Sequence, residues 1–88
     1  MTVVVKRDGS RENFKRDKIM KGIESAAKRV NVDKKRAKEI AERIARGVQD
    51  SYRDREEVRS RDIRDRVLKD LDREGKRIAK EFRSFNKD

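Results

Sequence analysis

A chain of 88 residues can enclose one modest hydrophobic core, so we expect a single domain over residues 1–88. Lys and Arg number 28 against 18 Asp and Glu, and the net charge of +10 favours polyanionic partners: nucleotides, nucleic acids or acidic protein surfaces. The absence of Cys and His excludes disulfides and thiolate metal sites and argues against a zinc site. No apolar run approaches membrane-spanning length, which predicts a cytoplasmic protein.

The chain begins with the pattern of a β-hairpin. Residues 2–7 contain three consecutive valines and residues 10–14 form a second short segment with strand character. The Asp8-Gly9 pair between them is a strong hairpin signal, typical of a type I′ turn whose two central residues both need positive φ. We expect Phe14 to lie beneath the resulting sheet as an aromatic anchor.

Two amphipathic helices are expected next. The first spans about residues 18–30, with Asp17 as its N-cap, and the pair Asn31 and Asp33 ends it and starts the second. The second helix ends near Tyr52. Although 52% of the chain is charged, the apolar residues recur at steps of three and four, which predicts a packed core and not disorder.

The last third of the chain predicts two more helices. Ser60 is suited to cap the third helix, which stops at Gly75, and the stripe of the fourth helix runs from Ile78 to Phe85. A brief strand over residues 57–59 fits before Ser60. A four-helix bundle capped by a small sheet would bury all four apolar stripes in one core.

The opening motif closely resembles that of the ATP-cone family. It reads Val-Val-Lys-Arg-Asp-Gly-Ser from Val4, a Glu two residues later, and Phe-x-x-Asp-Lys-Ile from Phe14. Cones are small nucleotide-binding regulatory modules of ribonucleotide reductases and of the zinc-ribbon repressor of reductase genes. The resemblance covers nearly the whole chain, although Glu81 and Asn86 depart from the family's ending. It implies an α+β fold in which a four-helix bundle is capped by a three-stranded sheet, made of the hairpin and one short strand.

The resemblance assigns three cations to phosphate and ribose. Lys6, Arg7 and Lys18 match these family positions, and a triphosphate requires convergent donors. The alternative is a solvated basic hairpin. Lys87 matches a terminal basic residue that some members use for phosphate, and Ser60 matches a small hydroxyl residue near the ribose, although a capping role also explains Ser60.

The resemblance also assigns residues to the base. Glu12 matches an acceptor for the adenine amino group, which selects adenine over guanine, although it could instead pair across the hairpin with Arg7 or Lys6. Val4 and Ile19 match the apolar residues that sandwich the base, and a core role is an equal alternative. Lys15 occupies a position near the base where some members carry Asn, so adenine recognition could differ there.

Catalysis has little support, because the chain lacks a nucleophile motif and a Walker pattern, and we predict a protein that is not an enzyme. The leading hypothesis is a regulatory module that binds ATP or dATP and signals by changing its oligomeric or partner contacts. Mg²⁺ could accompany the triphosphate, but Asp8 and Glu12 alone do not define a metal site. The sequence shows no reductase domain or zinc ribbon on which such a module could act. We therefore expect either an excised fragment or a free-standing cone acting on another protein.

Two other functions stay open. A small basic nucleic-acid-binding protein would explain the net charge, but aromatic residues are only 5% of the chain, Tyr52 is the one candidate stacking platform, and acids are interleaved with the basic residues. A protein-interaction module that kept the fold and lost its ligand is the third possibility. The retained cations and Glu12 argue against such a loss.

Overall fold

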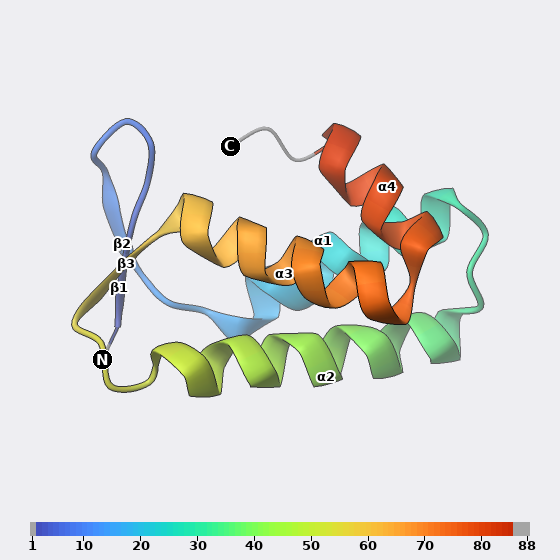
Figure 1. Ribbon diagram of the computed structural model, residues 1–88, viewed down its shortest axis with the longest axis horizontal. Coiled ribbons are helices and arrows are strands. Elements are labelled where there is room, and N and C mark those ends of the chain that lie inside the picture. Colours follow the sequence, from blue (N-terminus) through green and yellow to red (C-terminus); the bar gives the residue numbers. More distant parts are fainter. Residues whose placement is uncertain (1, 86–88) are drawn as a thin grey trace.

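The computed structural model describes residues 2–85. Within this part of the chain, two strands, two helices, a third strand and two further helices follow one another (Figure 1). Their bounds are β1 Val3–Val5, β2 Arg11–Asn13, α1 Arg16–Arg29, α2 Lys34–Tyr52, β3 Glu57–Arg59, α3 Ser60–Glu74 and α4 Lys76–Phe85. The α+β fold, with four helices and a small three-stranded sheet, confirms the class predicted from the sequence.

The sheet lies at one end of the helices and has the order β2-β1-β3 (Figure 1). Strand β1 is antiparallel to β2 and parallel to β3, and Val4 lies opposite both Glu12 and Val58. Val4 and Val58 are buried, whereas their neighbours along each strand are not, so the sheet has one face against the helices. Thr2 attaches this sheet to the end of α2, because its hydroxyl donates to the carbonyls of Tyr52 and Arg55 at 2.8 and 2.9 Å.

The hairpin turn differs from the predicted type I′ turn. The N–H of Gly9 donates to the carbonyl of Lys6 at 2.9 Å, and the N–H of Lys6 donates to the carbonyl of Ser10 at 2.8 Å. Gly9 has φ +88°, but Asp8 does not have a positive φ. This is a three-residue loop, in which a type I turn is followed by a left-handed glycine. Hydrogen bonds from Ser10 hold the Asp8 carboxylate in the turn and lower the pKa of Asp8.

Two predicted N-caps are wrong by one or two residues. Helix α1 begins earlier than expected, with Lys15 at the N-cap and Asp17 inside the first turn. The carboxylate of Asp17 still interacts favourably there with the positive end of the helix dipole. Helix α3 begins at Ser60, so Arg59 and not Ser60 is its N-cap. Pairing of β3 with β1 keeps Arg59 extended, and the chain turns helical directly afterwards.

The predicted break between α1 and α2 is confirmed. Asn31 has φ +60°, its N–H donates to the carbonyl of Lys28 at 3.2 Å, and the N–H of Val32 donates to the carbonyl of Ala27 at 3.0 Å. These two bonds form a Schellman motif, which satisfies the last carbonyls of α1. Asp33 then caps α2 by accepting from the N–H of Arg36 at 3.3 Å.

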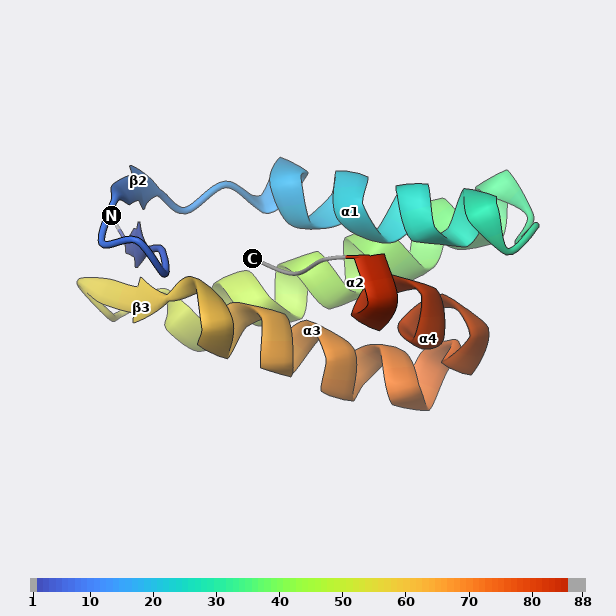
Figure 2. The ribbon, with the colours of Figure 1, turned by 90° about the horizontal axis from the view of Figure 1, so that it is seen from above.

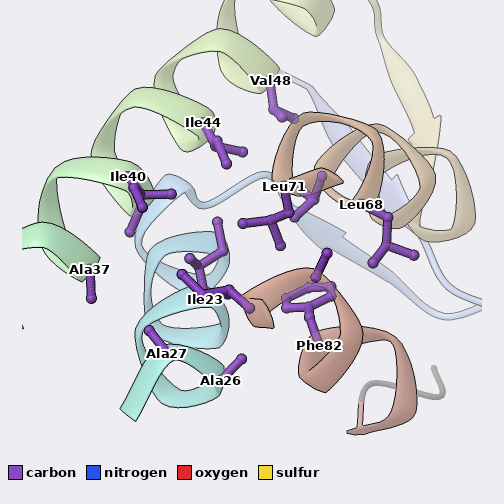
Figure 3. Packing of buried hydrophobic residues seen from close by; sticks show 14 residues of the cluster. Ile23, Ala26, Ala27, Ala37, Ile40, Ile44, Val48, Leu68, Leu71 and Phe82 are labelled. Carbon is purple, nitrogen blue, oxygen red and sulfur yellow. The ribbon is translucent and has the colours of Figure 1, made fainter. Parts of the chain in front are cut away.

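The core lies between the four helices (Figure 3). Its largest completely buried side chains are Ile23, Ile44, Leu71, Ile78, Val48 and Val67. Helix α4 is the shortest helix and packs between α1 and α3, at the end of the molecule opposite the sheet (Figure 2). Among residues 2–85, no helix has both the length and the apolar character required to cross a membrane.

Candidate functional site

A cavity of about 310 Å³ lies where the sheet meets the first halves of α1 and α3, with α4 on its far side. Its apolar lining consists of Val4, Phe14, Ile19, Ile63, Val67 and Phe82. Its polar lining consists of Lys6, Lys15, Lys18, Ser60 and Arg64. The sheet and three helices therefore contribute to one concave surface with an apolar interior and cations among its lining residues.

Gly22 keeps the cavity open between α1 and α4. A Cβ at this position would lie 3.4 Å from Cε2 of Phe82, so a longer side chain would enter the space that the glycine leaves. The neighbour at this position is thus a side chain and not the backbone of another element. A glycine within a helix lowers stability by about 1 kcal/mol relative to alanine. At position 22 the glycine also leaves the cavity open.

A second groove, of about 560 Å³, adjoins the cavity and shares Lys6, Ser60 and Arg64 with it. Its charged lining residues are Lys6, Arg7, Arg59, Arg61, Arg64 and Asp65. Five cations therefore face one carboxylate in this groove. An apolar cavity that continues into a cationic groove suits a ligand with an apolar ring at one end and negative charge at the other.

Glu12 holds two of the cations. Its carboxylate lies 3.0 Å from Nζ of Lys18 and 3.6 Å from Nζ of Lys6. The hydrogen bond from Lys18 is the main cause of a lowered pKa for Glu12, and the charges of Lys18 and Lys6 add to it. The cross-hairpin pairing of Glu12 with Lys6, one of the two interpretations from the sequence, is therefore present, and Lys18 joins it.

The structure brings most of the predicted site residues together. Those that line the cavity are Val4, Lys6, Lys15, Lys18, Ile19 and Ser60. Arg7 lines the adjoining groove. Glu12 pairs with two lysines that line the cavity, Lys6 and Lys18. Lys87 lies outside the described residues.

Sequence reasoning did not assign several lining residues to the site. Ile63, Arg64 and Val67 follow Ser60 by three, four and seven residues, so they share its face of α3. Gly22 follows Lys18 by four residues and belongs to the same face of α1. Helical spacing from residues already assigned would have found these four positions. Phe14 and Phe82 had no such signal, because the sequence predicted Phe14 only as an anchor beneath the sheet and placed Phe82 only in the apolar stripe of the fourth helix.

Comparison with known protein families matches residues 2–87 to the ATP cone domain. The chain belongs to the ATP-cone family. It is 36% identical over 87 residues to the transcriptional repressor NrdR of Synechococcus sp. (strain JA-3-3Ab), covering 94% of this chain and 42% of that protein. It is also 36% identical over 89 residues to the NrdR of Sorangium cellulosum, covering 97% and 57%. The NrdR of Streptococcus pneumoniae (strain Hungary19A-6) is 36% identical over 87 residues, covering 94% and 54%.

The chain spans about half the length of the curated relatives that it matches, which are transcriptional repressors. Within the described part of this cone, no group of three or more side chains could hold a metal ion. The site of this cone offers apolar contacts, amine and guanidinium donors, a hydroxyl group, the carboxylate of Asp65 and the carboxylate of Glu12, which is already paired with two lysines.

Proposed function

We propose that this cone binds ATP or dATP between its sheet and α1, α3 and α4, and that occupancy regulates an attached or separate partner. The observation that carries the proposal is the convergence of six residues matching the family's ligand positions on one cavity. The cavity volume of about 310 Å³ lies at the small end of the range for ligand pockets. The adjoining groove provides the additional room that a triphosphate needs.

The apolar cavity would hold the base. Val4 and Ile19 line it from β1 and α1, and Phe82 lines it from α4. An aromatic ring and branched aliphatic side chains are suited to the two faces of a purine. Glu12, beside this cavity, would accept a hydrogen bond from the amino group of adenine, whereas guanine presents a carbonyl at that edge.

The cationic groove would hold the phosphates. Lys6 and Lys18 lie beside the cavity, and Arg7 and Arg64 extend the donor set along the groove. Ser60 lines both spaces, so its hydroxyl would be next to the ribose. A hydrogen bond to the 2′-hydroxyl would favour ATP, whereas packing against C2′ would favour dATP. A magnesium ion, where it accompanies the nucleotide, would be held through the phosphates.

The ion pairs of Glu12 provide a way to couple binding to conformation. In the free protein the carboxylate holds Lys6 and Lys18, occupying the cations that phosphates would use. A triphosphate would compete for these cations and release Glu12 toward the base. Such an exchange would change how the hairpin is held against α1, so that the free and bound states differ at the protein surface. That difference would alter contacts with a second copy or a protein partner.

The relatives suggest what such a module controls. They are named as transcriptional repressors, and the family that the opening motif resembles also includes regulatory modules of ribonucleotide reductases. We infer that this cone reports adenine nucleotide levels to machinery connected with the supply of deoxynucleotides. Its own role would be regulatory and not enzymatic.

Titration calorimetry of ATP, dATP and GTP, with and without Mg²⁺, tests the proposal. The Lys6→Ala/Arg7→Ala variant should abolish saturable binding, whereas Lys69→Ala/Arg73→Ala should retain it. The control pair is exposed, carries the same charge and lines neither the cavity nor the groove. The ATP-to-dATP ratio would show which nucleotide is sensed. Heats that are absent, or equal for all three nucleotides and removed by salt, would overturn the proposal.

A further inference from the structure

Half of the net positive charge of the chain comes from a segment that lies away from the nucleotide cavity. Residues 21–38 contain seven Lys and Arg against two acids, and this surplus of five is half of the net charge of +10. Helix α3, in contrast, carries five basic and five acidic residues. Residues 21–38 comprise the end of α1, the connection and the start of α2, which lie at the end of the molecule opposite the sheet (Figure 1).

A groove of about 810 Å³ lies within this segment and shares no residue with the cavity. Its charged lining residues are Lys21, Lys28, Lys34 and Lys38, with Glu24 as the one acid. We call it the lysine groove. All four lysines are exposed, and none forms an ion pair with another described residue. Val32 and Ala37 provide the apolar part of its lining.

Two of these lysines, Lys34 and Lys38 at the start of α2, are unfavourable for the free protein. The first turn of α2 has Lys34, Lys35 and Arg36 and no acid, so three cations lie at the positive end of the helix dipole. Lys34 and Lys38 are also like charges one turn apart. A polyanion in the groove would reverse both effects, because it would bring negative charge to the helix N-terminus and to the paired lysines.

The arrangement fits a charged backbone. Lys21 and Lys28 are two turns apart on α1, which is a rise of about 10.5 Å along the helix axis. Lys34 and Lys38 are one turn apart on α2, which is a rise of about 6 Å. Phosphates follow each strand of a duplex at about 3.4 Å of axial rise, so the two rows would span several of them. The Schellman motif at Asn31 fixes one row relative to the other.

We propose that the lysine groove binds the sugar–phosphate backbone of double-stranded nucleic acid, independently of the nucleotide cavity. Lysine is a point charge without the forked geometry of arginine, and it suits contact with phosphates that is independent of base sequence. The groove lining lacks the Trp, Tyr and Arg anchors that dominate protein interfaces. Tyr52, the candidate stacking residue, lies at the other end of α2 with Arg55 over its ring at 5.6 Å.

Fluorescence anisotropy with a labelled mixed-sequence 20-base-pair DNA duplex, at several NaCl concentrations from 50 to 200 mM, tests the inference on the full chain. Lys21→Gln/Lys28→Gln/Lys38→Gln removes three groove charges, and Lys69→Gln/Lys76→Gln/Lys80→Gln removes three exposed charges elsewhere. The groove variant should bind at least about tenfold more weakly at 50 mM NaCl, and its slope of log K against log salt should fall by about 2 to 3. The control variant should bind within about threefold of the native chain.

Three results would overturn the inference: no binding at 50 mM NaCl, equal loss in both variants, or equally tight binding of polyglutamate that the groove variant also loses. Equal loss would mean that net charge alone attracts the duplex, and polyglutamate binding would indicate an acidic protein surface. Circular dichroism and ATP calorimetry on the same variants should be unchanged. Because the groove and cavity share no residue, failure of ATP binding would contradict the proposed function alone.

Discussion

The two basic regions of this cone differ in how their lysines are held. Next to the sheet, Lys6 and Lys18 share the carboxylate of Glu12 beside an apolar cavity. At the other end of α1, Lys21 and Lys28 line a larger groove without an ion pair to any described residue. Lys18 and Lys21 are less than one turn apart on α1, yet they belong to different sites.

The difference fits the two ligands that we propose. A small nucleotide needs donors held in fixed positions beside a surface for its base, because few contacts must overcome the entropy of binding. A duplex offers many equivalent phosphates, so mobile and unpaired lysines are sufficient. Glu12 organises the first set of cations, whereas the second set has one acid, Glu24, that pairs with none of them among the described residues.

Single substitutions of Lys18 and Lys21 should have the largest effects, and each should weaken the binding of one ligand only. Lys18→Ala should weaken ATP binding about 10- to 100-fold, because a hydrogen bond to a charged group contributes about 1.5–3 kcal/mol. Lys21→Ala should leave ATP affinity within about twofold. In the DNA assay the result should be reversed, with the salt slope reduced by about 1 for Lys21→Ala only. Parallel losses in both assays would show that the two basic regions act as one surface.

Glu12→Ala tests whether the acid beside the cavity selects the base. We expect the preference for ATP over GTP to fall about tenfold, because the acceptor for the adenine amino group is lost. GTP affinity should hold or rise, since Lys6 and Lys18 are no longer occupied by a carboxylate. Glu57→Ala is the matched control, since Glu57 pairs with Arg11 at 2.8 Å in the same sheet. An unchanged preference measured by calorimetry would limit Glu12 to a structural role.

The sequence predicted the fold where a physical signal was local. The apolar stripe of α2, the break at Asn31 and the stop at Gly75 follow from helical spacing and from residues with strong conformational preferences. The N-cap at Ser60 was misplaced because the pairing of β3 with β1 decides where α3 begins. That cause depends on a residue more than forty positions away, since Arg59 pairs with Val5.

The lining of the candidate site could be predicted in a similar way. The family motif supplied the hairpin and α1 residues, because they are adjacent in sequence and their spacing is fixed. Arg59 and Arg61 extend the cationic groove from the start of α3, and only the parallel pairing of β1 with β3 brings them next to Arg7. Phe82 lines the cavity from α4, and the position of α4 depends on its packing between α1 and α3.

Gly22→Ala and Gly47→Ala should have smaller effects that again distinguish the cavity from its surroundings. Both replace a helical glycine, so each should raise the free energy of unfolding by up to about 1 kcal/mol. Gly22→Ala should also weaken ATP binding several-fold, since its methyl group would lie beside Phe82 at the cavity. A Cβ at Gly47 would meet nothing within 4 Å, so ATP affinity should be retained. Equal ATP affinities in the two variants would place the base elsewhere.

The smallest expected effect is the pH dependence of the Glu12 ion pairs. The pKa of Glu12 is lowered from 4.5 in the folded protein, first by the hydrogen bond from Lys18 and then by the charges of Lys18 and Lys6. A lowered folded pKa contributes stability that is fully present above the unfolded value and is lost as the pH falls through the folded value. The melting temperature of the native chain should therefore exceed that of Glu12→Gln above pH 4.5, and the difference should shrink at lower pH. A difference for Glu12→Gln that stays constant between pH 7 and pH 3 would mean that its charge does not hold the two lysines.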